Sequence, residues 1–510
     1  MPDASFEPTQ RLHPTSWLFG VLTFVRQLIV PLIAAALFGS RSGTHLWLWA
    51  ALIPLVAAAA WRQLFYRYGL GPTGLVIRDG IFFRNVRQID YARIENIDTA
   101  RGPLHRLLGV AELRVETSTG GKPEALIQVL GLRDAETLRQ QVFAHRGETH
   151  TTAAPPPSEK CLLRLPASEL VKFGLIDNRG MILVAGFFGL LQQTGALELW
   201  GAFLKARISS QAVDTLTTFA PLAQALLGFA LLVALVLLVR VFSILLTLVT
   251  LHGFRLTRAG DDFRVRYGLA TRVSLTLRAR RIQAAYATET LLHRVFRRVS
   301  VRVDLAGGAA TGQSSEEANI KIRWLAPLAE PAQARSLIAQ ALPDIDVARP
   351  LAWQPLAPGA RRRIFVKICA AWSVSLLVLA ALLRTWLPLA LLVATAIISW
   401  WHAVMYVRYT RWALHEDALF FRRGWLTRRL AIMPRNRVQV VCVTSSPFDR
   451  RHRMAAVRVD TAGAAAQADQ VRIPYLEAQV ARELAAALYA SAAKSELDTL
   501  SVPEDTSAPP

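Results

Sequence analysis

The chain has 510 residues, of which 53% are hydrophobic and 19% charged, with a mean hydropathy of +0.30. It is too long for one ordinary domain, and its apolar content is higher than that of a typical soluble globular protein. The formal net charge of +22 is dispersed along the chain rather than gathered on one arm or helix. We therefore expect a membrane protein with basic cytoplasmic parts and no nucleic-acid partner.

The first residues and the cysteines fit a chain that stays in the membrane and has parts in a reducing compartment. Residues 1–16 are polar, and no small-residue cleavage site closes the first apolar run, so the first hydrophobic helix is expected to be retained. The cysteines, Cys161, Cys369 and Cys442, are isolated and odd in number. This argues against a disulfide framework and offers no C-x-x-C metal pair.

Six apolar runs follow one another in three tight pairs. Each run has about twenty residues, the length that crosses a hydrocarbon core of roughly 30 Å as a helix. Buried helices of a soluble protein are the alternative, but six such runs in three pairs favour membrane hairpins. The runs are residues 17–38 with 46–65, residues 181–200 with 219–239, and residues 364–383 with 386–407.

Basic residues predict the orientation of the hairpins. Three hairpins return the chain to one side each time, so the N-terminus and the three large segments after the hairpins share a compartment. The turns on the opposite side hold few basic residues, whereas the other helix ends are rich in arginine and lysine. By the positive-inside rule, the large segments and the C-terminus face the cytoplasm. The basic residues of the opposite turns are Arg41, Lys205, Arg207 and Arg384.

Two arginines interrupt the apolar runs. A charge at mid-bilayer costs about 2.5–3.5 kcal/mol even on a lenient scale. Arg26 in the first run either faces a polar intramembrane site or reaches the interface along its side chain, and we favour the second. Arg240 is expected to anchor the end of a span, because the apolar stretch around it is longer than the membrane requires.

The same sequence pattern follows each hairpin. With Arg93, Arg281 and Arg437 in register, an arginine recurs thirteen positions later without a gap in all three places. A third arginine recurs twenty-one positions after the first, followed each time by valine and an acid. Gapless matching over this length indicates a threefold internal duplication. The second and third sets of arginines are Arg106, Arg294 and Arg450, and Arg114, Arg302 and Arg458.

The repeat predicts a strand-rich domain closed by a helix. Apolar and charged residues alternate around Arg114, Arg302 and Arg458, which is typical of half-buried strands. Gly268 and Gly424 mark turns related to the turn at Asp79-Gly80. An apolar stripe then closes each copy as a helix. The fold class is α+β: six transmembrane helices with three domains, each a bent antiparallel sheet or partly open barrel capped by a C-terminal helix.

The domain organisation follows from these segments. We expect a polar N-terminus at 1–16, hairpins at 17–65, 173–251 and 364–407, domains at 66–146, 252–345 and 408–493, linkers at 147–172 and 346–363, and a disordered tail at 494–510.

The repeat resembles bacterial membrane proteins with pleckstrin-homology-like (PH-like) domains, which places the chain in a bacterial inner membrane. The first copy fits best, whereas the second lacks the glycine and the third has drifted further. The resemblance implies a seven-stranded bent sheet with a C-terminal helix, a binding role rather than catalysis, and for some members a connection with envelope stress or resistance to membrane-active peptides. The match rests on Arg93-Ile94, Leu104, Arg106 to Gly109 and Leu113 to Thr117.

The sequence offers no catalytic, cofactor-binding or metal-binding constellation. There is no Walker-type loop, H-E-x-x-H, G-x-S-x-G or cysteine–histidine pairing at ligand spacing. His105 and His293 share one repeat position, but the third copy has Asp449 there, which weakens an imidazole role. We therefore expect a protein that is not an enzyme and needs no cofactor.

The nine repeated arginines are the candidate site residues. Their planar guanidinium groups suit phosphate or carboxylate, so they are candidates to contact anionic lipid headgroups or partner proteins. The alternative is structural, with Arg106 paired to an acid such as Glu95 or Asp98. We favour the structural alternative slightly, because a fold signature explains the strict spacing equally well.

Two functions from different classes compete. The first is a scaffold whose cytoplasmic domains bind partner proteins, with strand edges that accept peptides and with a homo-oligomer as one form of assembly. The second is a component or regulator of a transport or export system. The apolar runs offer few polar groups for a transport path, which favours the scaffold.

Overall fold

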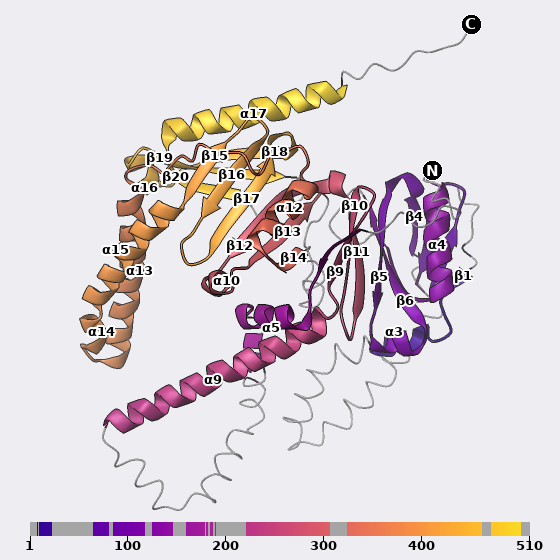
Figure 1. Cartoon of the computed structure of the whole chain (residues 1–510), viewed down its shortest axis with the longest axis horizontal. Coiled ribbons are helices and arrows are strands. Elements are labelled where there is room, and N and C mark those ends of the chain that lie inside the picture. Colours follow the sequence, from indigo (N-terminus) through magenta and orange to yellow (C-terminus); the bar gives the residue numbers. More distant parts are fainter. Residues whose placement is uncertain are drawn as a thin grey trace, which may run out of the picture. The chain divides into compact units, whose positions relative to one another are not determined.

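The computed structural model describes residues 8, 10–22, 65–80, 85–117, 125–145, 160–178, 180–181, 184–186, 189, 221–306, 324–461 and 471–500. These residues form two compact units, and the boundary between the units passes through the second repeat copy near residue 277. Strands and helices are coloured along the chain in Figure 1. Each unit contains antiparallel sheets with helices, so the α+β class is confirmed.

The first unit contains a four-stranded and a seven-stranded sheet. Gly74 is required in the first of these because a Cβ there would lie 2.3 Å from the carbonyl oxygen of Ile89 on the neighbouring strand. The smaller sheet has the order β1 (Gln10–Arg11), β2 (Arg67–Leu70), β3 (Gly74–Asp79), β4 (Asn85–Asp90). The larger has the order β7 (Ala125–Gly131), β6 (Val110–Thr117), β5 (Ile94–Arg101), β11 (Arg272–Leu277), β10 (Asp262–Tyr267), β9 (Arg255–Ala259), β8 (Lys160–Arg164).

The core of the first copy follows from the predicted alternation. Leu113 and Val115 of β6 are fully buried, while Arg114 between them is partly exposed. Helix α4 (Leu132–His145) lies along the sheets of this copy (Figure 1) and buries Leu138 and Val142 against them. The apolar stripe predicted for the closing helix is therefore confirmed.

Helices α5 (Ala167–Ile176) and α9 (Pro221–Thr250) pack closely in the first unit. Gly174 allows this approach, since a Cβ there would lie 2.6 Å from the Cα of Ile244. Arg240 of α9 donates to the carbonyl of Leu175 at 3.1 Å and to Asn178 Oδ1 at 2.7 Å, so it satisfies acceptors at the end of α5. Helix α9 continues for ten residues beyond Arg240. Arg240 is therefore a polar group within the helix, and its side chain caps the C-terminal end of α5.

The second unit contains a six-stranded and a three-stranded sheet. Helices α12 (Pro331–Ala341) and α17 (Ala478–Leu500) bury their apolar faces, including Leu337 and Ile338 of α12 and Leu484 and Leu488 of α17. The larger sheet has the order β14 (Trp324–Ala329), β13 (Val299–Leu305), β12 (Ile282–Glu289), β17 (Arg428–Pro434), β16 (Ala418–Arg423), β15 (Arg411–Leu414). The smaller has the order β18 (Val438–Thr444), β19 (Met454–Thr461), β20 (Val471–Glu477).

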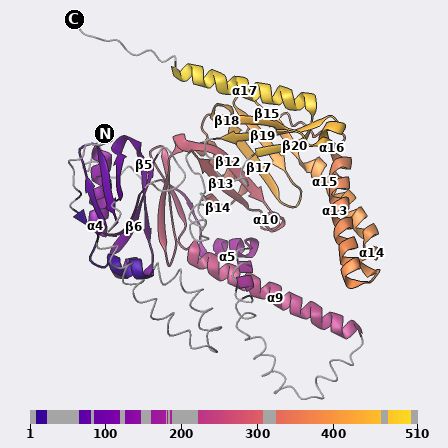
Figure 2. The same cartoon turned by 180° about the vertical axis from the view of Figure 1, so that it is seen from behind.

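Two described helices are long and apolar enough to cross a membrane. They are Gly228–Thr250 within α9, with a hydropathy of 2.9, and α13 (Ala360–Leu383), with 2.2. The sixth predicted run forms α14 (Leu387–Ala390) and α15 (Leu392–Tyr409), and α15 packs beside α13 (Figure 1), as the reverse view also shows (Figure 2). The predicted runs 17–38, 46–65 and 181–200 lie mostly outside the described residues, so six spans stay a prediction.

The chain before each predicted hairpin contributes to the domain that follows it. Strand β1 pairs with β2, β8 pairs with β9, and Gln354 forms a bridge with Trp412 of β15. With these strands included, the first copy comprises β1–β7 and the second β8–β14, the seven strands that the resemblance implies. The predicted polar N-terminus and the linker 147–172 therefore contain edge strands, and α17 extends to Leu500, past the predicted start of the tail.

Candidate functional site

The most distinctive feature of the described structure is the strand junction between successive copies. The fifth strand of one copy pairs antiparallel with the fourth strand of the next: β5 with β11 in the first unit, and β12 with β17 in the second. The register is the same in both, since Arg101 faces Arg272 in one junction and Glu289 faces Arg428, at the same repeat positions, in the other. The sheets therefore run on from copy to copy.

Small and apolar side chains make the second junction possible. Ala284 and Ala285 of β12 are completely buried, and Ile432 of β17 is 1% exposed. Ala284 and Tyr286 pack into the same core as residues of the third copy. Residues 284–287 of β12 are thus apolar on both faces, as expected of a strand inside a sheet rather than at its edge.

An arginine reinforces each junction. Arg106 on α3 (Pro103–Leu107) donates from Nη1 to the carbonyl of Leu269 at 2.8 Å. Arg294 on α10 (Leu291–Val295), thirteen positions after Arg281, donates from Nη2 to the carbonyls of Trp425 and of Leu426, the latter at 2.6 Å. Both arginines therefore reach the same turn of the following copy with charge-assisted hydrogen bonds.

The accepting turns depend on glycine. Gly268 and Gly424 have φ values of 112° and 84°, in the region that favours glycine. A Cβ would lie 1.9 Å from the carbonyl oxygen of Thr271 in the first turn and 2.3 Å from that of Thr427 in the second. The glycines identified from the sequence therefore shape the turns whose carbonyl groups the arginines contact.

Arg437, the first repeated arginine of the third copy, also connects two copies. It donates from Nη1 to the carbonyl of Arg280 at 2.6 Å and to that of Ile282 at 3.1 Å, both in the preceding copy. Its counterpart Arg281 donates to the carbonyl of Ala306 within its own copy at 2.5 Å. Arg93 lies 3.7 Å from Asp90 in an exposed ion pair.

The remaining candidates lie on strands or on the last short helix. Arg114 is paired with Glu112 at 2.8 Å, and Arg302 stacks over the ring of Trp324 at 4.3 Å. Arg458 lies on β19 opposite Cys442, and Arg450 is exposed on α16 (Pro447–Arg451). The nine arginines are therefore not gathered into one site, and the partner shown for Arg106 is a carbonyl of the next copy, where the sequence offered an acid of the same copy.

The shared histidine position stabilises the short helix of the second copy. His293 is 3% exposed; its Nδ1 lies 2.9 Å from Thr290 Oγ1 and its Nε2 lies 2.7 Å from Ser300 Oγ. Thr290 and His293 form a capping box at the start of α10. Burial lowers the pKa of His293 to about 4, so the imidazole is neutral at physiological pH.

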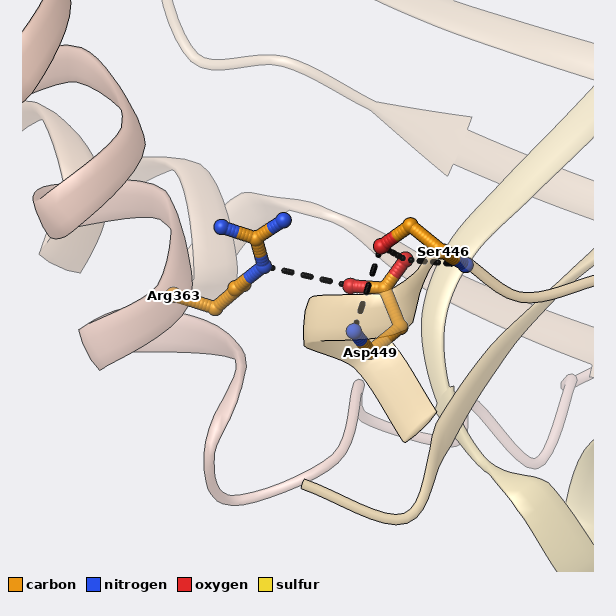
Figure 3. A network of polar contacts seen from close by, with 3 residues as sticks. All are labelled: Arg363, Ser446 and Asp449. Atoms are coloured by element: carbon orange, nitrogen blue, oxygen red, sulfur yellow. Dashed lines mark hydrogen bonds and ion pairs between the residues drawn. The ribbon is translucent and has the colours of Figure 1, made fainter. Parts of the chain in front are cut away.

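The equivalent position in the third copy connects a candidate span to its domain. Figure 3 shows Arg363 of α13 directed toward Asp449 of α16, with Nε 3.2 Å from Oδ1, and Ser446 beside Asp449. Ser446 Oγ lies 2.6 Å from Asp449 Oδ2 in a capping box. Burial acts to raise the pKa of Asp449, but the hydrogen bonds from Ser446 and Arg363 outweigh it and lower the pKa.

The described residues offer no metal site to set beside the junctions. Among them, no group of three histidine, cysteine, aspartate or glutamate side chains is placed to hold a metal ion. Sequence reasoning missed the junctions because it assigned each copy a separate sheet. The signal that could have revealed the second junction is the apolar segment 284–287 of β12, which lacks the alternation of an edge strand.

Comparison with known proteins identifies the family. The sequence pattern of the bacterial PH domain family matches residues 19–146, 213–342 and 373–492, most of the chain. The chain belongs to the bacterial PH domain family. The resemblance inferred from the repeated arginines is thereby confirmed, and each match includes one of the three copies.

One relative is similar to this chain over most of its length. The UPF0699 transmembrane protein YdbT of Bacillus subtilis (strain 168) is 22% identical over 475 residues, which are 88% of this chain and 92% of YdbT. No solved structure matches the chain. Together with the two apolar helices, these similarities make the chain a membrane protein with bacterial PH domains.

Proposed function

We propose that this bacterial PH domain protein is a non-enzymatic scaffold in the bacterial inner membrane, with its N-terminus, PH-like domains and C-terminus in the cytoplasm. Its role is to hold an array of domains beside the membrane and to present strand edges to partner proteins. The observation that carries this proposal is the pair of junctions, in which β5 pairs with β11 and β12 pairs with β17.

Strand pairing between copies supports a scaffold because it fixes each junction by a backbone ladder. A ladder resists rotation of one copy against the next, and the arginine contacts of Arg106, Arg294 and Arg437 add to it. Guanidinium groups used in this way are structural elements of the array. A junction held in this way lowers the entropic cost of presenting a binding surface.

The outer edge of the last sheet is a suitable surface for a partner. Strand β18 ends the three-stranded sheet, and its Val440 and Val443 are 56% and 41% exposed. An extended segment of a partner adds to such an edge by backbone hydrogen bonds and covers the apolar side chains. Protein partners are therefore favoured over lipid headgroups as ligands of this surface, and no nucleic acid is required.

The contact of Arg363 with Asp449 supports anchoring of the array. Both side chains are largely buried, with 17% and 16% of their surface exposed. Because Arg363 lies in the first turn of α13, the contact sets the position of the domain at the base of a candidate span. The transport alternative has less support: Arg240, a polar group within α9, is engaged by the end of α5.

Site-specific photo-crosslinking in native membranes tests the scaffold. A photoreactive residue in place of Val443 on β18 is compared with one in place of exposed Ala339 on α12. Protein adducts at Val443 and not at Ala339 support a binding edge. Equal adducts at both positions, together with solute flux through purified proteoliposomes, would favour transport and refute the proposal.

A further inference from the structure

Two strands of this chain, β4 and β18, lie at repeat positions that form a junction in another copy. Within the described residues, neither of them is paired in a junction. In each junction, the fifth strand of one copy pairs with the fourth strand of the next. The fourth strand of the first copy is β4. The fifth strand of the third copy, with the Gln354 bridge counted as the first, is β18. Within the described part of the chain, β4 ends the order β1-β2-β3-β4 and β18 ends the order β18-β19-β20. These two strands are therefore the two complementary halves of one junction.

Building on the proposed scaffold, we infer that the partner of β18 is β4 of a second copy of this chain. The two strands pair antiparallel, as β12 pairs with β17 inside the chain. Each contact leaves one β4 and one β18 available, so the contact is heterologous and extends into an open row of chains or closes into a ring.

The internal junctions specify the register of this contact. In the second junction Ala287 faces Leu430, and in the first junction Thr99 faces Ser274. The residues at the same repeat positions in β18 and β4 are Val443 and Val86. Both internal pairs therefore predict that Val443 faces Val86. Two separate junctions thus give the same alignment.

Exposure at these positions agrees with the alignment. Val86 is 58% exposed and Val443 is 41% exposed, so pairing places two uncovered apolar side chains opposite each other. Ala284 of β12 occupies the same repeat position as Val440 of β18. Ala284 is completely buried, whereas Val440 is exposed. The difference between β12 and β18 is therefore the one expected between an occupied and an open junction.

The composition of β18 favours an occupied edge. Open edge strands usually carry lysine, other charged residues or proline, which prevent indiscriminate pairing. The β18 sequence, residues 438–444, has five valine or cysteine side chains, one glutamine and one threonine, and no charge or proline. Such an edge requires a covering strand, and the strand that its repeat position selects is the fourth strand of a PH-like copy.

Arg450 supports the same contact from a different element. Its counterparts Arg106 and Arg294 both donate to the turn after a glycine of the following copy. Arg450 is exposed on α16, and the described residues contain no fourth copy for it to contact. The first copy has the equivalent glycine, Gly80, whose φ of 107° matches 112° at Gly268. A second chain supplies the following copy that Arg450 lacks.

Disulfide cross-linking between two differently tagged full-length chains tests the register. The native cysteines are first replaced (Cys161→Ser, Cys369→Ser, Cys442→Ser), then one chain carries Val86→Cys and the other Val443→Cys. Facing Cα atoms in an antiparallel ladder lie about 4.5–5.5 Å apart, within the range of about 4.4–6.8 Å that a disulfide spans. Mild oxidation of native membranes is expected to give a dimer that carries both tags.

The matched control moves one cysteine along the same strand. Val440→Cys is also exposed, but it lies three positions from Val443, or about 10 Å. Its combination with Val86→Cys is expected to give at least tenfold less dimer than the matched pair. Equal yields from both combinations would contradict the register and overturn the inference.

A second variant does not depend on cysteine placement. Arg450→Gln is expected to lower the yield of the dimer about tenfold, since hydrogen bonds from a charged donor contribute about 1.5–3 kcal/mol. The neighbouring exposed Arg451→Gln is the control for charge and helix propensity and should leave the yield unchanged. Equal loss in both variants would show that general charge, rather than a junction contact, holds the chains together.

The outcomes separate this inference from the proposed function. Photo-crosslinking at Val443 that captures a different protein, with no dimer carrying both tags, overturns the inference and leaves the scaffold standing. An internal disulfide within a single chain carrying both cysteines, again without dimer, also overturns it. Absence of any adduct at Val443 overturns both, whereas a tagged dimer supports both.

Discussion

The contact of Arg294 with the turn of the third copy gives the sharpest test of the junctions. Arg294→Gln removes a guanidinium that donates to the carbonyls of Trp425 and Leu426. Hydrogen bonds to charged groups contribute about 1.5–3 kcal/mol, and this contact is partly exposed, so we expect a loss of about 2 kcal/mol. The loss should be local, because the contact connects two strands of one sheet rather than the whole chain.

Amide hydrogen exchange of the full-length protein in detergent measures this local loss. A change of about 2 kcal/mol corresponds to roughly thirtyfold faster exchange. Faster exchange is expected in residues 285–289 and 428–432, the paired segments of β12 and β17. Exposed Arg297→Gln on the same loop is the control for charge.

The same variants separate the structural role from lipid binding. If Arg294 mainly contacts headgroups, Arg294→Gln weakens association of the protein with anionic vesicles while exchange in β12 and β17 is unchanged. Our reasoning is refuted if exchange in these strands matches the Arg297→Gln control. Equal vesicle binding by the two variants, with faster exchange only in Arg294→Gln, is the result expected from a junction.

Three further predictions follow from the site. The lowered pKa of His293, about 4 against an ordinary value of about 6.5, means that the unfolded chain takes up the proton first as the pH falls. Stability is therefore expected to decline between pH 6.5 and 4, by about 2–3 kcal/mol, and thermal unfolding of His293→Asn should lack this decline. A double-mutant cycle of Arg363→Gln and Asp449→Asn should show a coupling of about 1 kcal/mol or more in thermal unfolding; additive effects would contradict the contact. Gly424→Ala should destabilise the second junction by about 1–3 kcal/mol and raise exchange in β17, because its Cβ would meet the carbonyl of Thr427.

Patterns local in sequence were sufficient to predict the interior of each copy. The alternation around Arg114 placed Leu113 and Val115 in the core, and both are fully buried. The glycines at positions 268 and 424 were expected at turns, and both have positive φ. These features depend on residues a few positions apart, so hydrophobic periodicity and turn chemistry determine them.

Pairing between distant segments was beyond what the pattern could specify. The alternation of a strand tells which face is buried, but not which strand lies at its edge. Strands β1 and β8 were missed because they are short and are separated from their partners in sequence by a predicted membrane hairpin. The contact of Arg106 with Leu269 joins residues 163 positions apart, so no local signal reveals it.

The junctions also explain why the second arginine recurs at a fixed distance from the first. In the second copy, Arg281 precedes β12, residues 285–289 of β12 form the junction ladder, and α10 then carries Arg294 to the turn of the next copy. An insertion in β12 would shift its register against β17 or move Arg294 away from its acceptors. The spacing of thirteen is thus the distance that a junction strand and its short helix require, a constraint that headgroup binding alone does not impose. The third copy retains the same spacing between Arg437 and Arg450, as expected if β18 also forms a junction.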